Sequence, residues 1–89
     1  NNVTVTFGEI DFGSGVNAIE IVGRTHNAAD TLHLKFSDGT SDAVEFEHSD
    51  GIAAKQFKIK PVSGKQDLQL VFLPGCDFDL KSIKFFRQD

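Results

Sequence analysis

Three acidic residues close to the C-terminus have the residue type and spacing of a metal site. Asp77 and Asp79 flank Phe78, so in an extended strand both carboxylates lie on the same side of the chain. With Asp67 they could form a cluster for calcium, a hard cation that takes about 6–8 oxygen ligands. The alternative is that all three are solvated charges, as most Asp side chains are. Calcium is therefore the cofactor that the sequence suggests, with Asp67, Asp77 and Asp79 as its ligands.

A polar loop in the N-terminal half offers groups that could bind a ligand through hydrogen bonds. Residues 25–30 read THNAAD, with His26, Asn27 and Asp30 as donors or acceptors and Arg24 directly before them. Loops on a rigid sheet carry many binding sites, although a plain polar connection is the commoner outcome. The candidate ligand-binding residues are Asp79, Asp77, Asn27 and His26.

The remaining reactive side chains favour neither a zinc site nor catalysis. Zinc needs three or four converging ligands, whereas the histidines fall on a loop (His26), an outward strand position (His33) and a strand end (His48). His33 and His48 are expected near each other across a hairpin, as a surface pair. Cys76 is the single cysteine, which excludes an internal disulfide. Glycoside hydrolysis needs two carboxylates across a cleft, and no such pair is evident. We therefore expect no catalytic residues.

The composition describes a small acidic globular domain. The chain has 89 residues, a net charge of −4 and 39% apolar residues. Proteins that bind nucleic acid usually carry a basic face, and no stretch has the length of an apolar membrane span. Neither nucleic acid nor a membrane is therefore an expected partner. Nine Phe with no Trp or Tyr favour rings that fill a core.

Apolar and polar residues alternate in short runs along the chain, and no run keeps a helical period. Residues 8–15 are expected to form a Gly-rich connection, with Ile10 and Phe12 reaching into the core. The pattern predicts an all-β protein, an antiparallel β-sandwich of about seven strands. The expected strands cover residues 3–7, 18–24, 31–37, 43–48, 56–62, 67–72 and 78–86.

Two connections between the expected strands matter for function. Asp38-Gly39 is the strongest hairpin signal, and this hairpin would place His33 and Lys35 near the glutamates of the following strand. Pro74-Gly75 separates the last two strands, which we expect to form the centre of the sandwich. The loop between them is a natural place for a ligand. The expected core residues are Val5, Phe7, Ile19, Ile21, Leu32, Leu34, Phe36, Val44, Phe46, Phe57, Ile59, Leu68, Leu70, Phe72, Phe78 and Leu80.

Three stretches of the sequence carry a family resemblance. They read DFGSGVNAIEI at residues 11–21, GKQDLQLVFLPG at 64–75 and FDLKSIKFF at 78–86. In this order they resemble carbohydrate-binding modules of family 6, which are β-sandwich jelly rolls attached to glycoside hydrolases. The whole run, including VEFEHSD and VFLPGCDFDLK, looks closest to the C-terminal module of bacterial β-galactosidases of glycoside hydrolase family 2. The resemblance implies one galactose-binding-like module over residues 1–89, in a bacterial enzyme of the periplasm or the cell exterior.

The sequence also departs from the family pattern. The family's N-terminal strands, which supply calcium ligands and an aromatic ring to the sugar site, have no counterpart in these residues, so we expect a jelly roll without them. The family's closing strand commonly carries an Asn that hydrogen-bonds sugar and a Trp, and the matching positions here are Asp79 and Ser82. An ionised Asp accepts hydrogen bonds but cannot donate them. Since Trp and Tyr are also missing, we expect weak or no sugar binding.

Two functions follow from these observations. The resemblance implies a non-catalytic module that holds its parent glycoside hydrolase, a β-galactosidase, near an oligo- or polysaccharide. The alternative is a structural accessory domain that packs against the catalytic domain of the parent chain and binds no sugar. A sugar-binding module should expose a ring or a polar cleft, whereas a packing domain should expose an apolar patch.

Overall fold

The computed structural model describes residues 2–89, and these residues contain strands but no helix. Within them, no helix is therefore long and apolar enough to cross a membrane. The strands confirm the predicted all-β antiparallel architecture. They are β1 (Val3–Asp11), β2 (Val16–Thr25), β3 (Ala29–Phe36), β4 (Ser41–Glu47), β5 (Ala53–Val62), β6 (Lys65–Phe72) and β7 (Phe78–Phe86).

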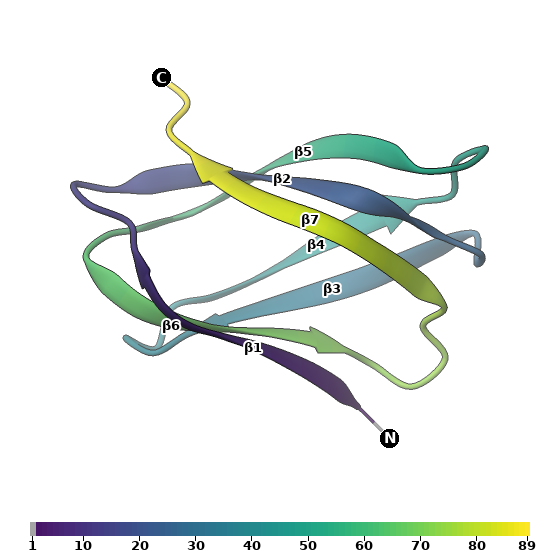
Figure 1. Cartoon of the computed structure of the whole chain (residues 1–89), viewed down its shortest axis with the longest axis horizontal. Coiled ribbons are helices and arrows are strands. Elements are labelled where there is room, and N and C mark those ends of the chain that lie inside the picture. The colour runs from purple at the N-terminus through teal and green to yellow at the C-terminus, as the bar shows by residue number, and fades with distance from the viewer. Residues whose placement is uncertain (1) are drawn as a thin grey trace.

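The strands form two antiparallel sheets that pack face to face (Figure 1). One sheet has the order β1-β6-β3-β4 and the other the order β5-β2-β7. Only β3 and β4 are consecutive neighbours within one sheet, since every other connection crosses to the opposite sheet. The crossings gather the loops at the two ends of the sandwich. The β2–β3, β4–β5 and β6–β7 loops share one end, at the right of Figure 1.

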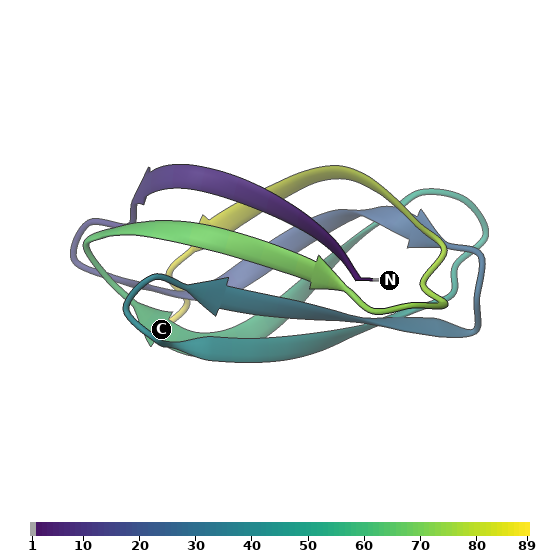
Figure 2. The same ribbon diagram turned by 90° about the horizontal axis from the view of Figure 1, so that it is seen from below.

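The first and last strands are edge strands of opposite sheets. β1 pairs with β6 and β7 pairs with β2, each along one flank. Both lie on the same long side of the sandwich, as the purple and yellow ribbons of Figure 2 show. β1 is longer than predicted, because the chain continues through an irregularity between Phe7 and Ile10 to Asp11. The expected Gly-rich connection over residues 8–15 is thus only partly a loop.

The last two strands do not form the centre of the sandwich together. β6 is central, because it lies between β1 and β3, and Leu68 and Leu70 are fully buried. β7 belongs to the other sheet, where β2 is its single neighbour among the described strands. The prediction of a paired C-terminal centre is therefore wrong for β7. Alternation shows which face of a strand is apolar, but it carries no information about which sheet the strand joins.

The predicted hairpin forms between β3 and β4, and Gly39 has a positive φ of 95° in its turn. The register places Lys35 opposite Ser41 and His33 opposite Ala43. The ion pairs of the described residues include none between these cations and the glutamates of β4. The hairpin thus brings these residues onto neighbouring strands, as predicted, but without an ion pair between them among the described residues.

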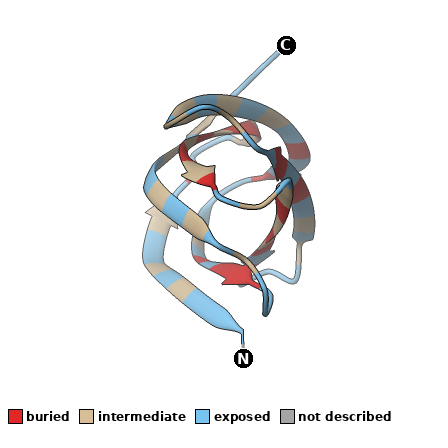
Figure 3. Ribbon diagram, turned by 90° about the vertical axis from the view of Figure 1, so that its right-hand side faces the viewer, coloured by how far each residue is buried: buried red, intermediate tan, exposed pale blue. Residues whose placement is uncertain are grey.

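The core lies between the two sheets and is largely the predicted one. Most of the expected residues are buried, and Phe12 joins them, as predicted, through edge-on contacts with Phe36 and Phe85 at centroid distances of 5.8 and 4.9 Å. The exceptions are half-buried because they lie on the edge strands β1, β5 and β7, where one flank has no neighbour. Figure 3 shows β1 in tan and pale blue without a buried residue. The half-buried exceptions are Val5, Phe7, Phe57, Phe78 and Leu80.

Candidate functional site

The two loops that the sequence singled out meet at one end of the sandwich. The N–H of His26 in the β2–β3 loop donates to the carbonyl of Asp77 in the β6–β7 loop at 2.9 Å. The side-chain Nδ2 of Asn27 donates to the carbonyl of Gly75 at 2.8 Å. Residues about 50 positions apart in the chain are thereby held in one polar surface.

A buried carboxylate fixes the geometry of both loops. Asp30 is 4% exposed and accepts hydrogen bonds from Thr25 Oγ1 (2.8 Å), Asn27 Nδ2 (2.9 Å) and the backbone N–H of Asp77 (3.0 Å). Burial alone would raise the pKa of this carboxyl, but the hydrogen bonds outweigh burial and hold the pKa below its ordinary value. Asp30 therefore stays ionised at neutral pH, and its buried carboxylate holds the two loops together through these hydrogen bonds.

An exposed cluster of polar side chains, two of them charged, lies next to these loops. Arg24 Nη2 approaches His26 Nδ1 at 3.1 Å, and His26 Nε2 approaches Asp79 Oδ2 at 3.2 Å. Because Arg only donates, His26 Nδ1 accepts, and the ring proton lies on Nε2, from which it is donated to Asp79. The His26 and Asp79 side chains are 41% and 56% exposed. The cluster therefore presents donors, acceptors and one flat ring to solvent.

The other two predicted ligand-binding residues, Asp77 and Asn27, form hydrogen bonds that hold the two loops together. Asp77 uses its backbone N–H and carbonyl to join Asp30 and His26, while its side chain is exposed. Asn27 uses its side-chain nitrogen twice within the loops. All four predicted residues thus lie at the same end, but Asn27 acts first as a structural residue.

A glycine sets the position of Asp79. The pairing of β2 with β7 shifts register between Val22 and Gly23. A Cβ atom at Gly23 would overlap the carbonyl oxygen of Asp79 and would lie 2.9 Å from ring atoms of Phe78. Since real Cβ atoms do not approach other atoms so closely, only glycine permits β7 to pack this near β2 and to place Asp79 opposite Arg24.

The expected calcium cluster is not assembled. Asp67 lies near the start of β6, where its backbone bonds Ser37 beside the β3–β4 turn, at the end of the sandwich opposite to Asp77 and Asp79. The eight residues of β3 that separate the two ends span about 25 Å. Within residues 2–89, no group of three or more His, Cys, Asp or Glu side chains could hold a metal ion.

His48 has a structural role, and the surroundings of Cys76 make its thiol unreactive. His48 Nδ1 lies 3.0 Å from the carbonyl of Thr25, and the His48 N–H donates to Ala28. His48 therefore closes the site end, far from His33, and the expected pairing of these two histidines is wrong. Burial and the negative charge of Asp30 raise the pKa of the Cys76 thiol, which disfavours the thiolate that a nucleophile needs.

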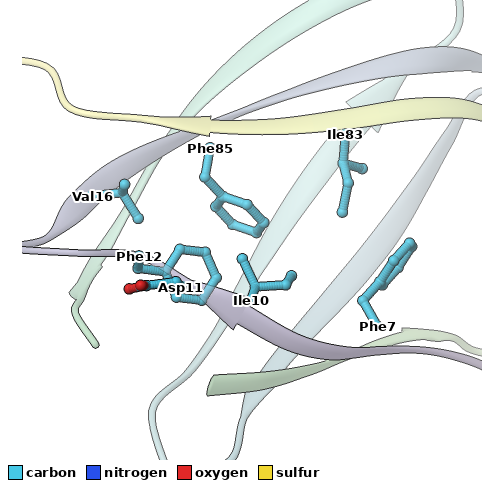
Figure 4. Close-up of a pocket in the computed structure, with 7 residues that line it drawn as sticks. All are labelled: Phe7, Ile10, Asp11, Phe12, Val16, Ile83 and Phe85. Carbon is cyan, nitrogen blue, oxygen red and sulfur yellow. The ribbon is translucent and has the colours of Figure 1, made fainter. Parts of the chain in front are cut away.

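A hollow with apolar walls lies away from the loops that form this site. It measures about 480 Å³ and sits between β1 and β7. Figure 4 shows Phe7 and Ile10 directed from β1 toward β7, and Ile83 and Phe85 directed from β7 toward β1. A second hollow of about 240 Å³ lies farther along the same two strands. Sequence reasoning missed this feature, because it depends on which strands become neighbours.

Comparison with known proteins identifies solved structures that share this fold. No family model and no curated protein matches the sequence. A solved family 6 carbohydrate-binding module, whose binding sub-sites were dissected by crystallography and titration calorimetry, is 23% identical with a TM-score of 0.82; the match covers 96% of this chain and 67% of that one. The module CsCBM6-3 from Clostridium stercorarium in complex with cellobiose is 22% identical with a TM-score of 0.84, over the same shares.

A third solved structure contains the fold within a larger chain. It is a family 43 arabinoxylan arabinofuranohydrolase from Bacillus subtilis in complex with cellotetraose, and it is 15% identical with a TM-score of 0.80. The match covers 96% of this chain and 19% of the hydrolase. Likeness at these identities establishes a shared fold. This chain therefore has the β-sandwich fold of family 6 carbohydrate-binding modules.

Proposed function

We propose that this chain is a non-catalytic carbohydrate-binding module of a glycoside hydrolase, and that the parent enzyme is a β-galactosidase. The observation that carries the proposal is the match of 96% of the chain to modules of this kind, one of them in complex with cellobiose. The proposal that the parent enzyme is a β-galactosidase rests on the sequence resemblance alone. Residues 1–89 are one module in this proposal, with the catalytic domain of the parent chain and an oligo- or polysaccharide as partners.

The proposed sugar site is the exposed cluster of Arg24, His26 and Asp79 with the adjoining Asp77. Asp79 binds His26 through Oδ2, and Oδ1 has no partner among the described side chains, so Oδ1 can accept a sugar hydroxyl. Arg24 donates in a fixed fork, and the His26 ring offers a flat face. Arg24 and Asp79 are held opposite each other on paired strands, and the backbone of His26 is held by the carbonyl of Asp77, so the ligand does not have to order these groups, which lowers the entropic cost of binding.

Binding at this site should be weak. Neutral sugars bind through aimed hydrogen bonds together with stacking on an aromatic ring. None of the nine Phe side chains is exposed, because each is buried or half-buried. The hydrogen-bonding half of a sugar site is therefore present without a large stacking platform. We expect a dissociation constant of about 1 mM, equivalent to roughly −4 kcal/mol.

Titration of the isotope-labelled chain with galacto-, xylo- and cello-oligosaccharides tests the proposal. One of these sugars should shift the backbone NMR signals of residues 24–27 and 75–79, and Asp79→Ala should abolish the shifts. Asp67→Ala is the matched control, because this exposed carboxylate lies at the opposite end. Binding that is unaffected by Asp79→Ala would contradict the assignment of the site.

A second function is favoured by the apolar hollow between β1 and β7. A structural accessory domain would pack on its parent enzyme without binding sugar, and the hollow offers apolar surface where such a domain needs it. The sugars should be tested up to a concentration of about 20 mM, which is about 20 times the expected dissociation constant. If the folded chain binds none of them at this concentration, the accessory function is favoured over sugar binding.

A further inference from the structure

The groove between β1 and β7 lies between the edge strands of two different sheets. Each of these strands has a neighbour on one flank only, and no hydrogen bond joins the described residues of β1 to those of β7. The inward side chains of both strands meet the two hollows of about 480 and 240 Å³. The groove is lined by Val5, Phe7 and Ile10 from β1 and by Leu80, Ile83 and Phe85 from β7.

The groove combines unpaired backbone groups with apolar side chains, and this combination favours a β-strand as its occupant. An edge strand presents a row of backbone N–H and C=O groups that lack partners, and an added strand satisfies them while its alternate side chains fill the groove. A small ligand would cover the apolar walls but leave the backbone row unpaired. β7 has nine residues and offers a pairing edge of about 30 Å.

The charges along β7 narrow the occupant further. Lys81 and Lys84 are exposed on the outer face of this strand, and Arg87 follows its end. A strand beside β7 is therefore favoured if it carries acidic residues on its outer face, because opposed charges across a pair stabilise it. In a second copy paired antiparallel through β7, the same lysines disfavour the register that sets Lys81 against Lys84, since like charges directly opposite each other destabilise a pair.

We propose that the groove between β1 and β7 binds a β-strand of the parent glycoside hydrolase chain, apolar at alternate positions and acidic between them. The strand would pair with the free edge of β7 and close the sandwich. The family 6 modules with the same fold leave about a third of their own length outside the match, so this fold is built elsewhere with more chain. The source of the strand rests on the proposed function, whereas the strand-binding groove does not.

A synthetic ten-residue peptide tests the groove in the intact 89-residue chain. Its residues alternate between Val or Ile and Glu or Thr, and both termini are blocked. It should bind and slow hydrogen exchange of β7 amides. A control peptide with two central proline residues cannot pair and should bind at least tenfold more weakly. Equal binding of the two peptides, or no binding by the folded chain, would overturn the proposal.

Substitutions then locate the binding. Ile83→Thr removes an apolar wall of the groove and should weaken peptide binding at least tenfold. Ile52→Thr is the matched control, because Ile52 is 54% exposed beyond the end of β4. If Ile83→Thr fails to fold, Lys84→Glu on the outer face decides instead: it should weaken the Glu peptide at least threefold and strengthen a Lys peptide.

Two further outcomes separate this proposal from its alternatives. If sedimentation shows a dimer that the peptide does not dissociate, a second copy occupies the groove, and the proposal is wrong. The sugar titration monitors the NMR signals of residues 24–27 and 75–79, whereas the peptide experiment monitors hydrogen exchange of the β7 amides. Absent sugar shifts with intact peptide binding would therefore refute the sugar site and leave the groove standing.

Discussion

The two long sides of the sandwich are closed by different means. On the side of β4 and β5, Lys60 donates from its backbone N–H to Asp42 Oδ2 at 2.8 Å and from Nζ to the carbonyl of Ser41 at 3.0 Å. Farther along, Lys55 Nζ donates to the carbonyl of Glu47 at 2.6 Å and lies 4.8 Å from the centroid of the Phe46 ring. Long side chains and one carboxylate thus span the gap between two edge strands.

On the side of β1 and β7, the described residues 2–89 form no such links. Its facing side chains are apolar, and they leave a hollow of about 480 Å³ where the opposite side has polar bonds. Edge strands can therefore seal a sandwich without pairing, provided that their side chains reach across and satisfy backbone groups. Where those side chains are short and apolar, closure requires more chain, which is the basis of the strand proposal.

The largest expected effect contrasts one Phe from each side. Phe46→Ala on the β4 side removes a fully buried ring whose centroid lies 4.8 Å from Lys55 Nζ, and it should lower the free energy of unfolding by about 3–5 kcal/mol. Phe7→Ala on the open side removes a half-buried ring and should cost only about 1–2 kcal/mol. Urea unfolding followed by circular dichroism measures both. Equal losses would show that the open side is packed as well as the closed one.

The next effect concerns the glycine that holds β7 against β2. Gly23→Ala places a methyl group against the Asp79 carbonyl and the Phe78 ring, and it should cost about 1–3 kcal/mol as β7 moves outward. In Gly8→Ala the nearest atom to the new Cβ is Asp67 Oδ1 at 3.6 Å, an ordinary contact, so this control should stay within about 1 kcal/mol of the wild type. Thermal unfolding compares the two variants. A neutral Gly23→Ala would contradict the close approach of the two strands.

The buried carboxylate at the loop end predicts a pH dependence. Because the pKa of Asp30 is lower in the folded chain than in the unfolded one, its ionisation stabilises the fold fully above the ordinary Asp value of about 3.9. That stability should be lost as the pH falls below this value and through the lowered pKa. Asp30→Asn should cost about 1–3 kcal/mol at pH 7 and remove this part of the acid dependence. Asp50→Asn, an exposed turn residue, is the control, and an unchanged acid profile in Asp30→Asn would contradict the assignment.

The smallest effect tests the polar link on the closed side. Asp42→Ala removes the acceptor of the Lys60 N–H and should cost about 0.5–1.5 kcal/mol. Hydrogen exchange of the Lys60 amide should accelerate by about three- to tenfold. Asp67→Ala removes a carboxylate on β6 and should leave this amide unchanged. Unaltered exchange in Asp42→Ala would show that the β4–β5 side does not depend on this bond.

Strand positions and the apolar face of each strand were predictable from the sequence by itself. Residues such as Leu32, Leu34 and Phe36 alternate with polar neighbours, and their period places them in the core whatever the topology. The loop end was predictable as well, because turn residues mark both loops. Alternation is a local property, since it reflects which side of a single strand meets water.

The tertiary structure alone decided which strands became neighbours. It separated Asp67 from Asp77 and Asp79, brought Arg24 opposite Asp79, and left β1 and β7 as facing edges of two sheets. These outcomes follow from pairings between residues far apart in the chain, and the side-chain period of two is the same for every partner. The chemistry of the loop end and the open groove both depend on that choice of partners, which is why composition and spacing predicted the residues of the site but not their full arrangement.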